Sequence, residues 1–433
     1  MQSVSMHNIA IRKYIVTGWE DDTVRREQIE ETKERLRENI VRSINSEGAV
    51  SDEYIHDLIE EYVLKSGHDT YLSVDEKEYL VRSIYNSIRG LDVLQDIIDN
   101  PEITEIMVNG TSHIFIEKNG VIDEYPYSFS DKARLDNVVQ QIVSKVNRMV
   151  NEANPIVDVR LLDGSRVNIV LPPVALDGPI ITIRKFPDKP ITMERLVEIG
   201  SITNEAVSFM KKLVRAKYNI LISGGTGSGK TTFLNALSNY IPSDERIITI
   251  EDSAELQIQN VPNLVRLETR NANVEGKNEI TIRDLIRSCM RMRPDRIIVG
   301  ETRDASAFDM LQAFSTGADG SLSTIHSNSA RDSLRRLETL VLMGKDIPVT
   351  AIRNNIASAI DISVQLGRLR DKSRKVLEIS EILDVKDGDI LVNPLYEFKE
   401  EGEDPTGKVI GCLKSTGNNL KNIRKLQYAG IEV

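Results

Sequence analysis

Nine residues in the middle of the chain, Gly224–Thr232, have the types and spacing of a phosphate-binding loop. Gly224, Gly229, Lys230 and Thr231 match the pattern G-x-x-x-x-G-K-[ST], in which glycines let successive backbone N–H groups turn toward phosphate oxygens. We expect the lysine to reach the β and γ phosphates of ATP and the threonine hydroxyl to bind Mg²⁺. The predicted nucleotide-binding residues are Gly224, Gly225, Thr226, Gly227, Ser228, Gly229, Lys230, Thr231 and Thr232.

The flanking sequence supplies the elements that such a loop needs. Asn219–Ser223 is an apolar run that predicts a buried parallel strand, and Phe233, Leu234, Leu237 and Ile241 recur at helical spacing after the loop. A helix that begins directly behind the glycines directs its dipole and its free N–H groups toward an anion. A flexible glycine turn without a ligand does not account for strand, loop and helix in this order.

Three more apolar strands in the second half of the chain end in side chains suited to hydrolysis, namely Glu251, Glu301 and His326. Ligands bind beyond the carboxyl ends of the strands in open parallel sheets, so we expect these side chains to converge with Lys230. Glu301 is a candidate Mg²⁺ site and general base, Glu251 is an alternative base, and the choice between them stays open. His326 is a candidate sensor of the terminal phosphate. Gly300 stands where the common phosphate-loop pattern has an aspartate.

Composition is that of an ordinary globular protein. The 433 residues are 40% apolar, and the length predicts about three domains. No run approaches the roughly 18 uninterrupted apolar residues of a membrane span. Met1–Trp19 lacks the apolar segment of a secretion signal, so we expect a cytoplasmic protein.

Charge and cysteine content exclude further classes. Sixty-six acidic against 55 basic residues give a net charge of −11, which argues against general nucleic-acid binding and against adsorption to membranes. Cys289 and Cys412 cannot build a zinc site by themselves and are expected to be reduced thiols. The five histidines have no metal-ligand spacing.

Local patterns divide the chain into four predicted regions. Residues 1–88 are rich in charge and helix formers and predict a helical region. Residues 89–187 combine strand and helix patterns and predict an α+β domain. Residues 188–200 follow a proline-containing stretch and predict a linker. Residues 201–433 contain the phosphate loop and predict the catalytic domain with a C-terminal extension.

The α+β region carries a hairpin signal and a helical stripe. Asn119-Gly120 lies between apolar segments and predicts a hairpin. Leu135–Val150 keeps apolar residues at helical spacing through four turns.

A second hairpin is expected around Asp163-Gly164, where the apolar side chains must share one face of the strands. Arg160 and Arg166 then share the opposite, polar face, either as ordinary exposed arginines or as phosphate contacts. The favoured three-residue loop predicts the pairs Leu161 with Val167, Val159 with Ile169, and Val157 with Leu171.

The motifs resemble, in their order, those of the secretion and type IV pilus ATPases. The phosphate loop is followed by Ile250–Leu256, an aspartate box, then Arg293–Glu301, an atypical Walker B motif, and Thr316–Asn328, a histidine box. The resemblance runs from about Leu91 to Leu383. Within this superfamily the chain looks most like the CpaF/TadA branch, which powers Tad (Flp) pilus assembly. The chain lacks the four-cysteine zinc element that is usual in the GspE and PilB type.

This resemblance implies an α/β fold with a RecA-like P-loop ATPase domain, preceded by an α+β domain and a small helical region. It implies a Mg²⁺-dependent ATPase that works as a homo-hexameric motor. The expected partners are polytopic inner-membrane platform proteins and, indirectly, pilins, which would hold the cytoplasmic ring at the inner face of the membrane. It also implies that Arg160, Arg166 and Arg184 meet the phosphates or a neighbouring subunit.

Other functions fit parts of the same pattern. A conjugation-type or archaeal-type secretion ATPase would share the motifs. A RecA-like nucleic-acid motor would share the core, although the acidic charge argues against it. A nucleotide switch would bind without significant turnover.

Overall fold

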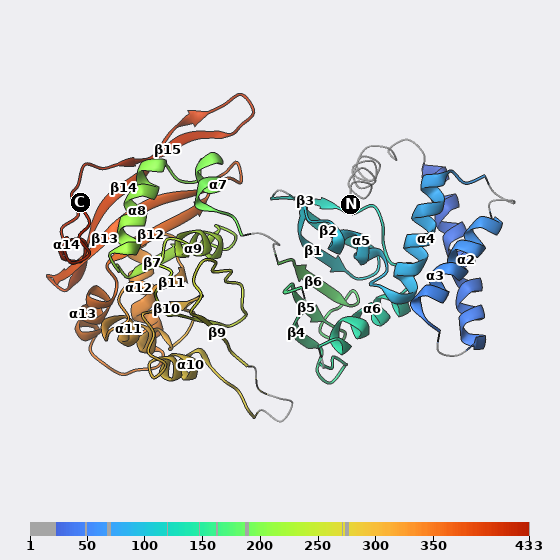
Figure 1. Ribbon diagram of the computed structural model, residues 1–433, viewed down its shortest axis with the longest axis horizontal. Helices are drawn as coiled ribbons and strands as arrows, with labels where there is room; N and C mark the ends of the chain where they lie inside the picture. Colours follow the sequence, from blue (N-terminus) through green and yellow to red (C-terminus); the bar gives the residue numbers. More distant parts are fainter. Residues whose placement is uncertain are drawn as a thin grey trace. The chain divides into compact units, whose positions relative to one another are not determined.

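The computed structural model describes the chain except for residues 1–22, 48–49, 67–70, 119, 147, 162, 187–189, 271, 273–276 and 433. The chain forms two compact units, Met1–Pro187 and Asp188–Val433. Figure 1 colours the first from blue to green and the second from green to red. Within the described ranges, no helix combines the length and the apolar character that crossing a lipid bilayer requires.

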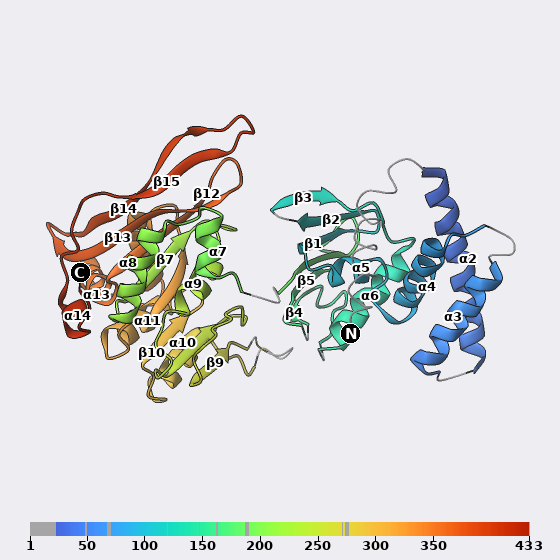
Figure 2. The same cartoon turned by 45° about the horizontal axis from the view of Figure 1, so that its top comes forward.

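The first unit begins with three helices that pack around an apolar core of their own. They are α2 (Thr23–Glu47), α3 (Asp52–Ser66) and α4 (Val74–Arg89), side by side in Figure 2. Ile40, Ile59 and Ile84 are buried in this core. α4 starts with a capping box, in which the side chains of Ser73 and Glu76 each accept a hydrogen bond from the other residue's backbone. The predicted N-terminal helical region is confirmed from Thr23 onward, and residues 1–22 of the predicted range 1–88 lie outside the described residues.

The rest of the first unit is a six-stranded sheet in the order β3-β2-β1-β6-β5-β4. Its elements are α5 (Val93–Asp99), β1 (Ile103–Asn109), β2 (His113–Lys118), β3 (Val121–Glu124), α6 (Lys132–Ser144), β4 (Ile156–Arg160), β5 (Arg166–Val170) and β6 (Ile180–Arg184). Apolar residues of the strands, α5 and α6 form one core. The first predicted hairpin is confirmed, since Lys118 lies opposite Val121. Asn119 itself lies outside the described residues.

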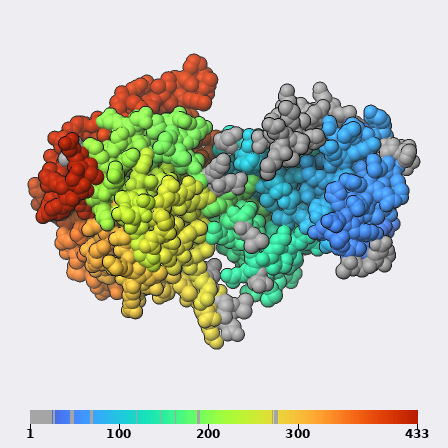
Figure 3. Space-filling view, in the orientation of Figure 1, coloured from blue at the N-terminus to red at the C-terminus, as the bar shows by residue number. Residues whose placement is uncertain are grey.

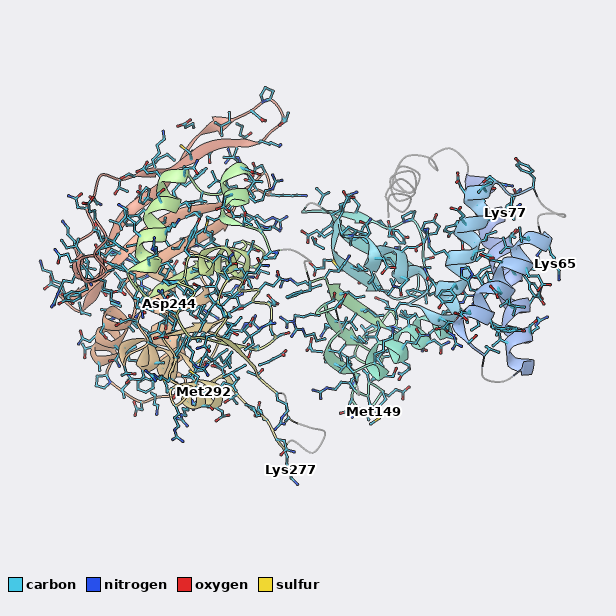
Figure 4. All side chains as sticks on the ribbon, in the orientation of Figure 1. Lys65, Lys77, Met149, Asp244, Lys277 and Met292 are labelled. Atoms are coloured by element: carbon cyan, nitrogen blue, oxygen red, sulfur yellow. The ribbon has the colours of Figure 1, made fainter. Side chains whose placement is uncertain are left out.

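The helix predicted for Leu135–Val150 is wrong at its C-terminal end, because α6 stops at Ser144. The N–H of Arg148 donates to the carbonyl of Val143, a bond to the fifth preceding residue that closes the helix. Met149 is 75% exposed and projects from this end of the unit (Figure 4). Val150 is nevertheless buried in the core, so the apolar spacing outlasts the helix.

The second predicted hairpin forms around a three-residue loop, but its predicted residue pairs are wrong. Leu161 lies opposite Ser165, and Val167 pairs with Val159 instead. In each of the three expected pairs, the observed partner therefore lies two residues earlier in the sequence than the predicted one. The carboxylate of Asp163 accepts hydrogen bonds from the backbone and hydroxyl of Ser165, so the turn closes earlier than expected. A two-residue shift leaves every side chain on its predicted face.

The second unit is built on a nine-stranded sheet in the order β15-β14-β13-β12-β7-β11-β10-β8-β9. The strands are β7 (Ile220–Gly224), β8 (Ile247–Glu251), β9 (Leu264–Glu268), β10 (Arg296–Val299), β11 (Leu322–His326), β12 (Ile362–Arg368), β13 (Arg374–Lys386), β14 (Asp389–Glu403) and β15 (Val409–Ser415). The six strands from β12 to β9 in this order pair in parallel, and β13 to β15 add antiparallel strands. The β14–β15 hairpin projects from the surface of this unit (Figure 3).

Helices cover both faces of this sheet. One face carries α7 (Met193–Glu198), α8 (Asn204–Arg215), α9 (Lys230–Ser238) and α14 (Arg424–Tyr428), and the other α10 (Ile282–Cys289), α11 (Ala307–Ser315), α12 (Ala330–Leu342) and α13 (Val349–Ala359). Along β7, Ile220 and Ile222 enter the first core and Leu221 enters the second. Parallel strands between two helical layers are the predicted α/β, RecA-like fold class, which is confirmed.

Residues 188–200, expected to be a linker, contain α7. Met193 and Leu196 are buried in the same core as Ile220, and the hydroxyl of Thr192 caps the helix. The second compact unit therefore starts at Asp188 rather than at residue 201.

Arg296, at the start of β10, connects three parts of the second unit. Its fully buried guanidinium pairs with Glu245 and donates to the carbonyls of Val214 at 2.7 Å and Gly320 at 3.2 Å. Gly320 has a φ of 81°, and a Cβ added there would lie 2.4 Å from Arg296 Nη1. Displacing a buried charge from its partners is strongly destabilising.

We expect Gly320→Ala to lower the free energy of unfolding of the second unit by about 3 kcal/mol, because the methyl group displaces this guanidinium. Gly317→Ala is the matched control, since Gly317 also has a positive φ, 112°, but a Cβ there meets nothing within 4 Å. It should cost only about 1 kcal/mol of backbone strain. Denaturant unfolding measures both losses, and equal losses would contradict the role of Arg296.

Candidate functional site

The phosphate loop connects the buried strand β7 to α9, in the predicted order of strand, loop and helix. Gly227 and Gly229 have φ values of 69° and 92°, which glycine adopts without strain. Gly224 is closely packed, because a Cβ there would lie 2.4 Å from Ser228 Oγ. Gly229 is also the N-cap of α9, so the free N–H groups of the first helical turn border the loop.

Lys230, the first residue of α9, turns its buried side chain back to the loop. Its Nζ donates to the carbonyls of Gly224 and Gly225 at 3.1 Å each and lies 3.3 Å from His326 Nδ1. Thr231 follows in the same turn and is partly buried. The ammonium group and the predicted Mg²⁺ ligand therefore both border the phosphate loop.

His326 connects the phosphate loop to Glu301. It ends β11 opposite Gly224 of β7, and its Nε2 lies 2.9 Å from Glu301 Oε1. Burial lowers the pKa of His326. The charge of Glu301 raises this pKa in part, and the charge of Lys230 lowers it further. The lowered pKa favours the neutral imidazole, whose ring lies between Lys230 Nζ and the carboxylate of Glu301.

Arg303 is a functional candidate that sequence reasoning missed. Its Nη2 donates to Glu301 Oε2 at 2.6 Å, and its Nη1 lies 4.0 Å from Asp252 Oδ2. The hydrogen bond to Glu301 raises the pKa of Arg303. The only signal was its position two residues after Glu301, in the loop that leaves β10.

Glu251 ends β8 and is almost fully buried. Its Oε2 accepts hydrogen bonds from the backbone N–H groups of Glu255 at 2.7 Å and Leu256 at 2.8 Å. Burial raises the pKa of Glu251 to about 7, and these two donors offset only part of that effect.

Gly300 leaves room for the side chain of Glu251. A Cβ at position 300 would lie 3.0 Å from Glu251 Cγ, which gives a physical reason for glycine where related loops carry aspartate. Within the described ranges, neither Glu251 Oε1 nor Glu301 Oε1 accepts a hydrogen bond, although both atoms are buried. Buried oxygens without a donor suit a water molecule or a cation.

The oxygen donors of the site fit Mg²⁺. In the part of the chain that is described, no group of three or more His, Cys, Asp or Glu side chains could hold a metal by itself. Mg²⁺ usually binds through one or two carboxylates together with phosphate oxygens and water. Glu301 and the hydroxyl of Thr231 therefore suit a cation that arrives with a nucleotide.

The three predicted arginines form a row on the sheet of the first unit. Arg160 lies opposite Arg166, and Arg166 lies opposite Arg184, so all three share one face. Opposed like charges destabilise a sheet unless other groups compensate. On the neighbouring strand β1, Glu105 lies opposite Arg184. The Arg160 guanidinium lies 5.7 Å from the centre of the Phe186 ring. Contact of these arginines with a nucleotide stays a prediction.

Known proteins resemble most of the chain. Residues 88–415 match the family described as type II/IV secretion system protein. The conjugal transfer protein TrbB of Rhizobium radiobacter is 34% identical over 309 residues, which cover 70% of this chain and 90% of TrbB. The type IV secretion system protein VirB11 of Brucella suis is 31% identical over 303 residues, covering 64% of this chain and 84% of VirB11.

Solved structures of this kind also align. The crystal structure of the VirB11 ATPase from Brucella suis in complex with sulphate is 28% identical, with a TM-score of 0.37, covering 66% of this chain and 95% of that chain. The pilus retraction motor PilT with bound ADP is 18% identical, with a TM-score of 0.48, covering 78% and 88%. The comparisons identify the superfamily expected from the sequence but do not single out the CpaF/TadA branch.

The raised pKa of Glu251 predicts how the stability of the second unit depends on pH. Below the ordinary value of 4.5 the carboxyl is neutral in the folded and the unfolded chain, so its burial carries no charge penalty. As the pH rises to about 7, only the unfolded chain ionises freely, and stability falls. We expect a loss of about 3 kcal/mol between pH 4.5 and 8.

Glu251→Gln should lack this loss because an amide does not ionise. Denaturant unfolding at pH 5 and pH 8 measures the difference, with Glu279→Gln, which changes an exposed carboxylate, as the control. The control should keep the wild-type pH dependence. The same pH dependence in wild type and Glu251→Gln would contradict the buried environment of Glu251.

Proposed function

The chain belongs to the type II/IV secretion system protein family, and from this premise we propose that it hydrolyses ATP to drive a secretion or pilus machine. The convergence of Lys230, His326 and Glu301 with Glu251 at one edge of the sheet carries the proposal. A phosphate loop alone would also suit a nucleotide switch. Two carboxylates at the same edge of the sheet add the means to activate water.

The phosphate loop binds the nucleotide in this proposal. N–H groups of Gly224–Thr232 and of the first turn of α9 hold the phosphates, and Lys230 exchanges its two carbonyl partners for phosphate oxygens. Bound through Thr231 and Glu301, Mg²⁺ would neutralise phosphate charge and help to orient the attacking water.

Glu251 is the general base that the electrostatics favour. A pKa of about 7 lets its carboxylate accept a proton from water at neutral pH and release it again. Glu301 is better placed to orient water on the Mg²⁺ side, because Arg303 and His326 hold it in position. His326 contacts both Lys230 and Glu301, so a change in the terminal phosphate can reach Glu301 through it.

The motor function goes beyond the nucleotide site. We propose a homo-hexameric ring that acts on polytopic inner-membrane platform proteins and, through them, on pilins or other substrates. Arg160, Arg166 and Arg184 would supply positive charge to phosphates of the same or a neighbouring subunit. Their row on one sheet face supports a shared anionic ligand.

Two machines are candidates for this motor. The similarity to TrbB and VirB11 supports a conjugation-type or type IV secretion machine. The order and the residues of the sequence motifs support a Tad (Flp) pilus machine of the CpaF/TadA branch. ATP hydrolysis by the purified ring, measured with each type of membrane platform, distinguishes them, since only the cognate platform should stimulate turnover.

We expect Lys230→Ala to abolish ATP binding, because the buried ammonium is the phosphate partner. Glu251→Gln should bind ATP normally but hydrolyse it about 100-fold more slowly, since the amide cannot accept a proton. Lys277→Ala is the control, a substitution of an exposed lysine between β9 and α10 that is labelled in Figure 4. Nucleotide titration and phosphate release measure the two steps.

Near-normal hydrolysis by both Lys230→Ala and Glu251→Gln would refute the proposed site. Hydrolysis that rises steeply with DNA and falls with salt would instead favour a nucleic-acid motor, against which the net charge of −11 argues.

A further inference from the structure

The hairpin of β12 and β13 reaches the phosphate loop from the side away from the catalytic strands. β7 pairs with β11 on one side and with β12 on the other, where Leu366 lies opposite Gly224. The carbonyl of Leu366 would lie only 2.8 Å from a Cβ on Gly224. The hydroxyl of Ser223 donates a hydrogen bond to Oε1 of Gln365, so side chains also join the two strands.

Arg374, the first residue of β13, contacts the loop directly. Its Nε donates to the carbonyl of Gly227 at 2.7 Å, and its Cδ would lie 3.6 Å from a Cβ on Gly229. Its own carbonyl accepts from the hydroxyl of Ser201 at 2.6 Å, which anchors the backbone at this point. A cationic side chain on a fixed strand therefore holds one peptide group of the phosphate loop.

The orientation of the peptide group between Gly227 and Ser228 determines the direction of one N–H group that could bind a phosphate. A trans peptide is planar, so its C=O and its N–H point in opposite directions. With the Gly227 carbonyl directed at Arg374, the N–H of Ser228 points into the loop, where it meets the carbonyl of Gly225 at 3.4 Å. That distance is beyond the usual range for a hydrogen bond, so a phosphate oxygen can replace this acceptor at little cost.

A second arginine increases the positive charge at the same place. Arg368 ends β12 directly opposite Arg374, on the same face of the hairpin. Two arginines of the hairpin therefore lie where it contacts the phosphate loop.

We propose that Arg374 is a positioning residue of the phosphate site, which holds the Gly227 carbonyl outward so that the Ser228 N–H faces the phosphates. Arg368 contributes positive potential beside it. The inference rests on the proposed function, because it presumes that the loop binds a nucleotide. It makes the C-terminal strands a part of the nucleotide site.

Binding of two ligands to the full-length chain tests this inference. Titration calorimetry with ADP and with pyrophosphate gives a Kd for each ligand, and pyrophosphate has neither base nor ribose. We expect Arg374→Ala to weaken both ligands by about tenfold, because a charge-assisted hydrogen bond that orients a phosphate donor is lost. Arg374→Lys keeps a cationic donor and should recover most of the affinity for both ligands.

Arg370→Ala is the matched control. Arg370 belongs to the same hairpin but pairs with Glu400 and Glu403 of β14 instead of the phosphate loop. Its variant should bind both ligands as the wild type does, and the melting temperature of ligand-free Arg374→Ala should equal that of Arg370→Ala.

Three results would overturn the inference. Unchanged affinity in Arg374→Ala excludes positioning, and weaker binding of ADP alone places the side chain at the base or ribose. A lower melting temperature in Arg374→Ala, without recovery of affinity in Arg374→Lys, indicates a merely structural role. If the wild-type chain binds neither ligand, the proposed function itself fails, which is a different outcome.

Discussion

The position of β11 between β7 and β10 is the constraint on which the candidate site depends. Parallel strands present their carboxyl ends at one edge of a sheet, and here each neighbouring strand delivers one chemical group to that edge. β7 leads to Lys230, β11 ends at His326, and β10 leads to Glu301. The inserted strand explains why an imidazole, rather than a direct ion pair, connects the phosphate loop to the carboxylate.

The same edge gives two neighbouring glutamates different chemistry. Glu251 is buried against Gly300, where desolvation raises its pKa, whereas Glu301 is held by Arg303 and His326. Environments that differ in this way separate a proton acceptor from a group that stays in place. A side chain larger than hydrogen at position 300 would crowd the side chain of Glu251.

The sequence was most informative where a local pattern determines a local structure. The phosphate loop, the strand ends and both hairpins follow from glycine spacing and apolar runs, because short-range backbone geometry limits what such runs can form. The alternation of apolar and polar residues along the two strands also predicted that Arg160 and Arg166 share a face, although the observed pairing is shifted by two residues. The alternation of side chains along a strand determines which face each residue occupies, whereas the turn at Asp163 sets the register of the pairing.

Features that depend on distant contacts were not predictable in this way. Val150 keeps the helical spacing of α6 although the helix has already ended, because a turn can bury an apolar side chain equally well. Arg374 lies 147 positions from Gly227 in the sequence, and only the pairing of β12 with β7 brings them together. The most direct test of the hydrolytic site is a structure of the chain with Mg²⁺ and a non-hydrolysable ATP analogue. We predict that Lys230 leaves the carbonyls of Gly224 and Gly225 for the phosphates, with Glu251 facing the water in line with the terminal phosphate; a nucleotide bound elsewhere, or Lys230 still on those carbonyls, would contradict the account.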